Sequence, residues 1–351
     1  MEGQCAAGWL VDLAYLKDPY LATRCAQVAN RVVDLHAQAA FSPLAILRLA
    51  TLIREGQYDV VHTHLLKADA YGAVAARLAR APLVIASKHN DEYVLRRPAV
   101  ALIHGWLTRL TDRVIVLSDH VGRYMQRVGR VPAERIRRVY YGIEPLPAVG
   151  VAEHRAAVRA EFGIPPEAPL LLSVGRLDPQ KGHLDLLAAL RRVVTALPPV
   201  QLVIAGDAQQ ATASYSRALR QAAATPDLAG RVHWAGHRDD VPRLLAAADV
   251  FVLASHWEGF GLALVEAMAA HRPVVATAAS AIPEVVVHER TGLLVPPHDP
   301  AALAQAILRL CADPALRARM GAAGAAHVAE HFTADRMVRD TLALYAAAGA
   351  S

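Results

Sequence analysis

Short apolar runs alternate with segments of helical periodicity along the whole chain. The runs that have the length of strands are 9–16, 31–36, 58–63, 82–87, 113–117, 136–141, 169–174, 201–205, 231–235, 250–254 and 273–277. Between them, apolar residues recur three or four positions apart, for example in 43–56, 67–80, 98–110, 182–197 and 239–248. This alternation predicts repeated strand–helix units.

The predicted strands are apolar at successive positions, as in VIVL at 114–117 and VFVLA at 250–254. Strands of this kind are covered on both faces, which indicates a parallel sheet with helices above and below it. The segment 143–151 holds two prolines and no charged run, and is typical of a linker. We therefore predict two tandem doubly wound (Rossmann-like) α/β domains. Their ranges are 1–146 and 147–335, with a last helix in 336–351 that can cross back to the first domain.

The composition excludes several classes of protein. The chain has 351 residues, of which 54% are hydrophobic and 20% charged, so it is neither disordered nor collagen-like. Its three cysteines lie far apart, which argues against a disulfide framework or a zinc site. The most apolar run, 242–254, is interrupted by Asp or Arg before it reaches the length of a bilayer span, and the first residues lack a signal-peptide pattern. We expect a cytoplasmic protein, and its net charge of +5 favours anionic partners.

The first candidate site follows the strand 169–174, where the sequence continues as GRLDPQKG. Gly175 permits a sharp turn, and Arg176 and Lys181 place two permanent cations at the carboxyl end of a parallel strand, where ligands bind in such sheets. Two phosphate groups would need a pair of this kind. A basic loop that only ends the strand accounts for these residues equally well.

The second candidate site follows the strand 250–254, where SHWEGFG leads into the helix LALVEAMAA. Glu266 is the only charged residue of that helix, so we expect it to be largely buried. Its partner is then either a ligand diol or a core Arg or Lys. The Gly259–Gly261 turn leaves backbone N–H groups at the helix N-terminus, which suits an anion. Glu258 and Glu266 are about 12 Å apart if both are helical, too far to share a proton.

Several motifs in this order resemble one known family. They are GRLDPQKG at 175–182, the Glu258/Glu266 pair, GHRDD at 236–240, ADVFVLAS at 248–255 and PEVV with GLLVPP within 283–297. Together they resemble the family 4 glycosyltransferases, which are retaining enzymes of the GT-B fold that use nucleotide-activated sugars. The resemblance covers nearly the whole chain and is densest in its second half.

The resemblance implies a role for each matching residue. Arg176 and Lys181 would bind the diphosphate, and Glu266 the ribose. Glu258 and the amides of the turn that follows it would hold the sugar hydroxyls and the distal phosphate. The base would lie against the loop from Gly236 to Asp239. The implied donor-binding set is Arg176, Lys181, Gly206, Gly236, Asp239, Glu258, Phe260, Gly261, Leu262 and Glu266.

The first half of the chain matches the family more loosely. DVVHTH at 59–64 and SKHND at 87–91 both place a histidine at the end of a predicted strand. His89 occupies the place of the family histidine that contacts the transferred sugar, and His64 is a weaker candidate. A lone histidine at a strand end is more often structural, so only the resemblance favours His89. The implied catalytic residues are His89, Glu258, Arg176 and Lys181.

The resemblance also implies the reaction and its partners. The chain contains no D-x-D, the usual anchor for a phosphate-bridging metal, so we expect neither a metal nor another cofactor. Arg176 and Lys181 would stabilise the leaving group instead, with front-face attack by a hydroxyl of a saccharide or a lipid-linked acceptor. Cell-envelope, lipopolysaccharide or exopolysaccharide assembly would fit. The alternatives are a nucleotide-sugar-binding protein without activity, or an epimerase or phosphorylase on the same scaffold. Dispersed basic residues and few aromatics argue against nucleic-acid binding.

Two features depart from the family pattern. The family opens with a strand and a Gly-rich loop before the strand that 9–16 resembles, and the chain starts too late for them. We therefore expect a gap in the first sheet and weak or absent activity. Arg123, Arg127 and Arg130 fall at helical spacing and are followed by Arg135, Arg137 and Arg138. Such a face could rest on anionic lipid at the inner side of the membrane, although a solvated helix face is the more frequent explanation.

Overall fold

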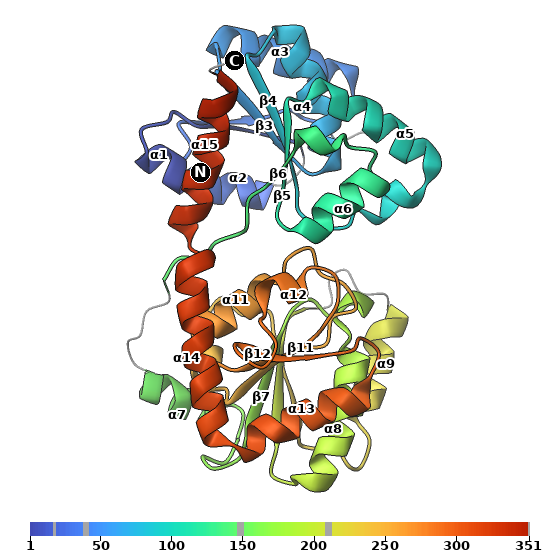
Figure 1. The fold of residues 1–351 in the computed structure, drawn as a ribbon, viewed down its shortest axis with the longest axis vertical. Coiled ribbons are helices and arrows are strands. Elements are labelled where there is room, and N and C mark those ends of the chain that lie inside the picture. Colours follow the sequence, from blue (N-terminus) through green and yellow to red (C-terminus); the bar gives the residue numbers. More distant parts are fainter. Residues whose placement is uncertain (17–18, 38–41, 146–150, 208–212, 350–351) are drawn as a thin grey trace. The chain divides into compact units, whose positions relative to one another are not determined.

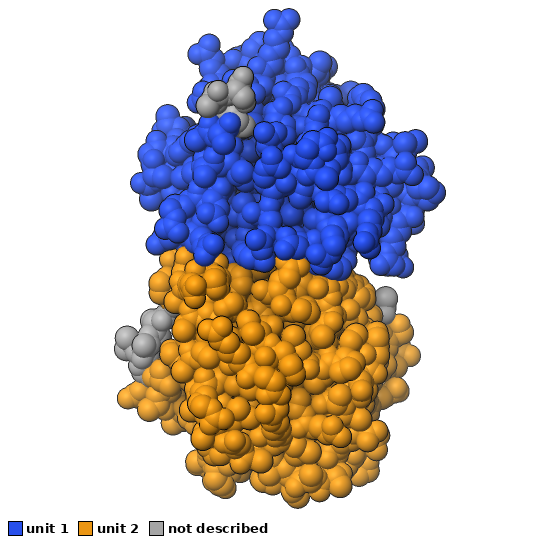
Figure 2. All heavy atoms as spheres, in the orientation of Figure 1, with its two compact units in different colours: residues 1–142, 334–351 blue, residues 143–333 orange. Residues whose placement is uncertain are grey.

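A computed structural model describes residues 1–16, 19–37, 42–145, 151–207 and 213–349. The chain forms two compact units (Figure 2): unit 1 comprises Met1–Gly142 and Ala334–Ser351, and unit 2 comprises Ile143–Thr333. The centre of the predicted linker, 146–150, lies outside the described residues and includes the predicted boundary. Within the described ranges, no helix combines the length and the apolar character needed to cross a bilayer.

The described residues of unit 1 form six parallel strands in two sheets. The strands are β1 (Asp12–Tyr15), β2 (Arg31–Asp34), β3 (Val60–His64), β4 (Leu83–Lys88), β5 (Arg113–Val116) and β6 (Ile136–Arg138). The first two pair with each other, and the other four form a sheet in the order β3-β4-β5-β6. Among the described residues, no strand pairing joins the two sheets.

Several helices of unit 1 begin with a proline or directly after a serine that serves as the N-cap residue. They are α1 (Glu2–Ala6), α2 (Pro19–Cys25), α3 (Pro43–Gly56), α4 (Leu66–Ala79), α5 (Pro98–Leu107), α6 (Asp119–Arg127) and α15 (Ala334–Gly349), with 3-10 turns η1 (Tyr93–Arg96), η2 (Thr108–Leu110) and η3 (Ala133–Arg135). Ser42 and Ser118 cap α3 and α6 by accepting hydrogen bonds from backbone N–H groups of the first turn. These elements follow the helical periodicity of the sequence closely.

The last helix of the chain completes the core of unit 1 (Figure 1). Tyr345 of α15 is 5% exposed and packs with Leu83 and Ile85 of β4. Its hydroxyl lies 2.6 Å from Nδ1 of His62 and accepts a hydrogen bond of 2.9 Å from Gln4. Residues 334–349 therefore belong to unit 1 although they follow unit 2 in the sequence.

Unit 2 is one six-stranded parallel sheet in the order β12-β11-β10-β7-β8-β9. Its strands are β7 (Leu170–Val174), β8 (Gln201–Ala205), β9 (Val232–Gly236), β10 (Val250–Leu253), β11 (Val274–Thr277) and β12 (Gly292–Val295). Its helices are α7 (Val151–Glu161), α8 (His183–Ala196), α9 (Ala213–Ala223), α10 (Val241–Ala247), α11 (Leu262–Ala269), α12 (Ile282–Val285), α13 (Pro300–Ala312) and α14 (Pro314–His331), with the 3-10 turn η4 (Pro179–Lys181). The edge strand β12 is the one that the apolar runs did not predict: it begins at a glycine and two prolines follow it.

Both faces of the unit 2 sheet are covered by helices. All four residues of β10 are at most 1% exposed. Val250 and Val252 pack in one cluster with apolar residues of α8 and α13, and these two helices contact each other (Figure 1). The residues between them, Phe251 and Leu253, must point to the opposite face because side chains alternate along a strand. The prediction of two-sided burial is confirmed.

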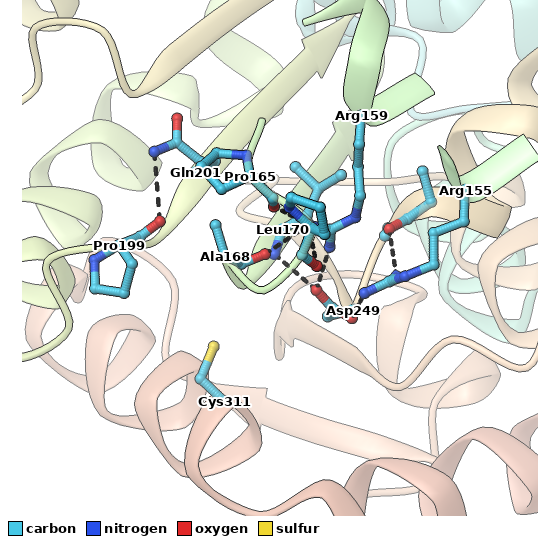
Figure 3. A network of polar contacts seen from close by, with 12 residues as sticks. Arg155, Arg159, Pro165, Ala168, Leu170, Pro199, Gln201, Asp249 and Cys311 are labelled. Carbon is cyan, nitrogen blue, oxygen red and sulfur yellow. Dashed lines mark hydrogen bonds and ion pairs between the residues drawn. The ribbon is translucent and has the colours of Figure 1, made fainter. Parts of the chain in front are cut away.

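A buried ionic network joins α7 to the start of two central strands (Figure 3). The Asp249 carboxylate accepts hydrogen bonds from Arg155, Arg159 and the backbone N–H of Leu170, at 2.8–2.9 Å. The Arg159 side chain is 4% exposed and also donates to the carbonyl oxygens of Pro165 and Ala168. These bonds use the terminal Nη groups of the buried guanidinium, while its Nε–H has no partner among the described residues. Since Asp249 directly precedes β10, the network lies at the amino ends of β7 and β10.

Candidate active site

The carboxyl ends of β10, β7 and β8 lie side by side, because these strands are parallel neighbours in the unit 2 sheet. The loops after β7 and β8 approach so closely that glycine is required. A Cβ at Gly206 would lie 1.9 Å from the carbonyl oxygen of Gly175, and Gly206 has a φ of 148°. The N–H of Gly206 donates to the carbonyl oxygen of Gly236 at 2.7 Å. Gly206 thus allows the carboxyl ends of β7 and β8 to approach each other, and its bond to Gly236 adds the end of β9.

The loop after β7 also packs against the loop after β10, and again a glycine permits the contact. Gly182 has a φ of 63°, and a Cβ there would lie 2.0 Å from the carbonyl oxygen of Ala254. Gln180 supports the contact by donating to the carbonyl oxygen of Trp257 at 2.9 Å. Sequence reasoning did not single out Gly182, although its place directly after Lys181 is the signal that could have found it.

Lys181 and Glu258 form an ion pair between these two loops. Lys181 Nζ lies 2.6 Å from Glu258 Oε1, and the two side chains are 16% and 8% exposed. Ser255 Oγ donates to the same carboxylate oxygen at 2.7 Å, a contact that the sequence analysis missed. The ammonium group has three N–H donors, of which this pair uses one. The structure thus brings two predicted site residues into direct contact, where the sequence assigned each to a different part of the ligand.

Arg176 lies on the same loop as Lys181 and is the more exposed of the two cations. Its guanidinium pairs with Asp178 at 3.1 Å, and its side chain is 48% exposed. His183, the first residue of α8, holds the backbone of Arg176 through a contact of 3.2 Å between its Nε2 and the carbonyl oxygen. Burial lowers the pKa of His183 to about 4, so this imidazole is neutral at pH 7.

The helix α11 begins at the turn that carries the second motif. Gly261 is its N-cap residue with a φ of 94°, and Leu262 is its first helical residue. Phe260 is 3% exposed and packs edge-on against Phe332, with ring centroids 5.5 Å apart. This anchor fixes the turn. The first N–H groups of a helix have no intrahelical acceptor, so the start of α11 is suited to an anion.

Glu266 lies one turn further along α11 and is half-buried. Burial raises the pKa of its carboxyl group. Among the residues that the structure describes, no Arg or Lys pairs with this carboxylate and no group donates a hydrogen bond to it. The alternative of a pairing with a core cation is therefore not found in those residues. A partly desolvated carboxylate without a protein partner remains beside the start of α11.

Of the two predicted base-binding residues, Gly236 is held at the edge of the site by a backbone hydrogen bond and Asp239 is exposed to solvent. Gly236 ends β9 with a φ of 67° and accepts the hydrogen bond from Gly206. Asp239 is 94% exposed in its side chain and contacts only His237, at 3.4 Å, among the ion pairs of the described residues. The structure thus builds Gly236 into the site edge and leaves Asp239 at the surface. The loop that continues beyond Asp207, residues 208–212, lies outside the described residues.

His89 lies in unit 1, directly after β4, in a row of aromatic rings. Its Nε2 is 3.0 Å from Nδ1 of His64, and its Nδ1 contacts the hydroxyl of Tyr141. The rings of His64 and His89 are stacked with centroids 5.2 Å apart. Burial, followed by the nearby His64, lowers the pKa of His89 to about 4. His89 is therefore neutral at pH 7 and has both ring nitrogens engaged. Sequence reasoning missed Tyr141.

The fold and this site define a glycosyltransferase of the GT-B class, and comparison with known proteins supports that class. Residues 154–327 match the family described as glycosyl transferases group 1, and residues 2–145 match glycosyltransferase family 4. A D-inositol 3-phosphate glycosyltransferase of Streptomyces bingchenggensis is 32% identical over 334 residues, covering 90% of this chain and 72% of that protein. The chain belongs to glycosyltransferase family 4.

Other relatives support the same assignment. A UDP-Gal:alpha-D-GlcNAc-diphosphoundecaprenol alpha-1,3-galactosyltransferase of Escherichia coli is 28% identical over 285 residues, or 78% of this chain and 71% of that one. The crystal structure of Anabaena Alr3699/HepE in complex with UDP-glucose superposes on this chain with a TM-score of 0.83. The two sequences are 25% identical, and the match covers 95% of this chain and 91% of that chain. The prediction of a family 4 glycosyltransferase with the GT-B fold is confirmed.

Proposed function

We propose that this glycosyltransferase transfers a sugar, with retention of configuration, from a nucleoside-diphosphate donor to a hydroxyl of a saccharide or lipid-linked acceptor. The pathway would be cell-envelope or exopolysaccharide assembly. The observation that carries the proposal is the 2.6 Å contact between Lys181 and Glu258. It joins the loop that holds both cations to the loop that begins α11, so that groups for a diphosphate and for a sugar lie together.

The charges of the site fit the charge that develops during transfer. Cleavage of a glycosyl–phosphate bond makes the sugar ring positive and the departing diphosphate more negative. Arg176, Lys181 and the start of α11 would stabilise that negative charge from fixed positions. Lys181 retains two N–H donors for phosphate oxygens after pairing with Glu258. We propose that these protein groups serve in place of a divalent ion at the diphosphate.

Glu258 and His89 would act on the sugar and its hydroxyls. Lys181 and Ser255 hold the Glu258 carboxylate, which can accept hydrogen bonds from sugar hydroxyls through its second oxygen. The neutral His89 would bond to a sugar hydroxyl only by giving up its contact with His64 or Tyr141. In front-face transfer, the acceptor hydroxyl passes its proton to the departing phosphate oxygen, so no protein nucleophile is needed.

The relatives indicate which donor to test first. Alr3699/HepE binds UDP-glucose in its crystal structure, and the Escherichia coli relative is named for UDP-Gal and a diphosphoundecaprenol-linked acceptor. We infer that a UDP-hexose is the donor and that a lipid-linked saccharide is the acceptor class. A thermal-shift panel of UDP-, GDP- and ADP-sugars tests the base. The anomer of the sugar first released from UDP-α-glucose, followed by NMR, tests retention: the α anomer supports it and the β anomer contradicts it.

Glu266→Ala is expected to weaken UDP binding about ten-fold or more, because the ribose would lose an ionised hydrogen-bond acceptor. Isothermal titration with UDP measures the change. Glu330→Ala, which removes an exposed glutamate of α14, is the matched control and should leave the affinity unchanged. Equal UDP affinity in the Glu266→Ala variant and the unaltered chain would remove Glu266 from the donor site.

We propose that unit 1 also contacts anionic membranes at a hollow between α5 and α6. The hollow has a volume of about 670 Å³, and the arginines that line it are Arg96, Arg123, Arg127 and Arg130. Large apolar side chains project from the neighbouring η1 and α5, namely Tyr93, Leu102, Ile103 and Trp106, each about 60–70% exposed. A basic hollow beside exposed apolar side chains suits lipid headgroups and the upper acyl chains.

Three further arginines of the predicted basic face bind groups of unit 1. The guanidinium of Arg135 donates to the carbonyl oxygens of Thr108 and Thr111, and Arg137 donates to two nearby carbonyl oxygens. Arg138 pairs with Asp119 at 3.3 Å. The basic face is therefore narrower than the sequence suggested, since the folded chain uses these three guanidinium groups to hold its own loops.

Arg127→Glu is expected to lower binding to anionic vesicles about thirty-fold, because each unit charge near an anionic surface contributes about 1 kcal/mol and the reversal changes the charge by two units. Co-sedimentation with phosphatidylglycerol-containing vesicles and with pure phosphatidylcholine vesicles measures it. The matched control is Arg220→Glu, the same charge reversal on exposed α9. Binding that does not depend on anionic lipid, or equal losses in both variants, would contradict the proposed surface.

A further inference from the structure

Two histidines and one aspartate that the transfer reaction does not use converge in unit 2. Asp185 lies in the first turn of α8, His256 follows β10 and His298 follows β12. One ligand atom from each side chain lies within 4.8 Å of the others. No other group of three or more His, Cys, Asp or Glu side chains converges in this way among the described residues. We propose that this cluster, the Asp185–His256–His298 site, binds one divalent transition-metal ion, Zn²⁺ in the first instance.

The distances in the cluster are close to those of a zinc site. His256 Nε2 lies 2.9 Å from Asp185 Oδ2, and His298 Nδ1 lies 3.6 Å from the same oxygen. Bonds of about 2.0–2.1 Å in tetrahedral geometry separate two ligand atoms by about 3.3 Å. The two measured distances lie on either side of this value. The ligand atoms of the two imidazoles lie at most 4.8 Å apart, so side-chain adjustments of about an ångström or less would admit the ion.

The backbone around the cluster places the two imidazoles. A Cβ at Gly182 would lie 3.3 Å from His256 Nε2, so the glycine leaves room for the ring. The backbone N–H of His256 donates to the carbonyl oxygen of Gln180 at 2.8 Å. His298 has a φ of 59°, a left-handed conformation that a residue with a side chain adopts at a cost. That conformation places its ring against His256, with centroids 4.0 Å apart.

The type of ligand selects the metal. Two imidazole nitrogens and one carboxylate form a set that favours Zn²⁺, Co²⁺ or Ni²⁺, whereas Mg²⁺ and Ca²⁺ require mainly oxygen ligands. The partial positive charge at the N-terminus of α8 disfavours a cation that is bound only by electrostatic attraction. A transition-metal ion gains coordinate bonds from the imidazole nitrogens, and the negative charge of Asp185 offsets the partial positive charge of the helix N-terminus. The exposed His298 leaves a path from solvent to the cluster.

The ion would connect three loops that are distant in sequence. Asp185 lies in the first turn of α8, His256 lies two residues before Glu258, and His298 precedes α13. These are loops at the same edge of the sheet as the Lys181–Glu258 pair, although the cluster itself supplies no group to the diphosphate. Metal that binds the folded chain and not the unfolded chain stabilises it, so unit 2 should unfold at a higher temperature in Zn²⁺.

Zinc titration of the full chain, freed of metal by chelation, tests this inference. The unaltered chain should bind one more Zn²⁺ per chain than His298→Gly, a variant that removes a ligand and also relieves the left-handed φ. Asp185→Asn, which keeps the shape of the side chain, should weaken that Zn²⁺ at least about ten-fold. The control is His36→Ala, because His36 contacts only one carboxylate, that of Asp34 at 3.4 Å, among the ion pairs of the described residues.

The outcomes distinguish specific Zn²⁺ binding at the Asp185–His256–His298 site from nonspecific Zn²⁺ binding by surface histidines. The inference holds if His298→Gly and Asp185→Asn lose the same Zn²⁺ together with its thermal stabilisation, while His36→Ala keeps both. It also requires that millimolar Mg²⁺ does not displace the Zn²⁺. Zinc binding and thermal stabilisation that are the same in His298→Gly as in the unaltered chain would overturn it.

Discussion

Lys181→Ala is expected to lower kcat about 10²–10³-fold, with a smaller effect on donor affinity. The ammonium group lies 2.6 Å from Glu258 and has two further N–H donors for the departing diphosphate. Removal of one preorganised donor to a developing anion has an effect of this size in other enzymes. The side chain also balances the Glu258 carboxylate, which is 8% exposed, so the sugar-binding loop loses its partner as well.

Turnover of UDP-glucose and its affinity by titration, measured separately, test this expectation. Arg191→Ala is the matched control, because Arg191 is an exposed cation of α8 that pairs with Asp227 outside the site. Thermal unfolding of each variant shows whether the fold is retained. A Lys181→Ala variant that is folded and keeps normal kcat would exclude Lys181 from leaving-group stabilisation.

Asp249→Ala is expected to destabilise unit 2 by about 3–5 kcal/mol, because the change leaves the buried guanidinium of Arg159 without its counter-charge. Arg159 is 4% exposed in its side chain and cannot reach water without disrupting the ends of β7 and β10. The N–H of Leu170 also loses its acceptor. The free energy of unfolding in urea, followed by a probe in unit 2, measures the loss.

Asp227→Ala provides the comparison for this prediction. Asp227 pairs with Arg191 at 2.7 Å, but both side chains are exposed to solvent. Exposed ion pairs contribute little because water screens them and the side chains lose entropy on pairing. The loss of stability in Asp227→Ala should therefore be much smaller. Equal losses in the two variants would show that burial of the Asp249 network does not matter.

The parallel sheets were predictable from the sequence because burial leaves a direct mark on it. A strand such as β10, apolar at every position, is compatible with few environments other than the centre of a sheet covered on both faces. Gly175 and Gly206 could be placed at strand ends because each directly follows one of these apolar runs. In contrast, the run of β12 begins at Gly292 and is followed directly by Pro296 and Pro297, residues that are typical of a loop.

The pairing of charges at the site could not be predicted. Arg176, Lys181 and Glu258 all follow central strands, but nothing in the sequence states that Lys181 pairs with Glu258 rather than with a ligand. The Asp185–His256–His298 site escaped notice for a related reason. Its members are distant in sequence and meet only because the strand order of unit 2 places their loops at one edge. Glu266, expected to be largely buried, is half-buried.

A crystal structure of the chain with UDP tests the central claim most directly. The account predicts that diphosphate oxygens lie within hydrogen-bond distance of Lys181 Nζ and the Arg176 guanidinium, near the first N–H groups of α11, with the ribose against Glu266. A diphosphate bound elsewhere in the chain, with Lys181 still engaged only by Glu258, would contradict it.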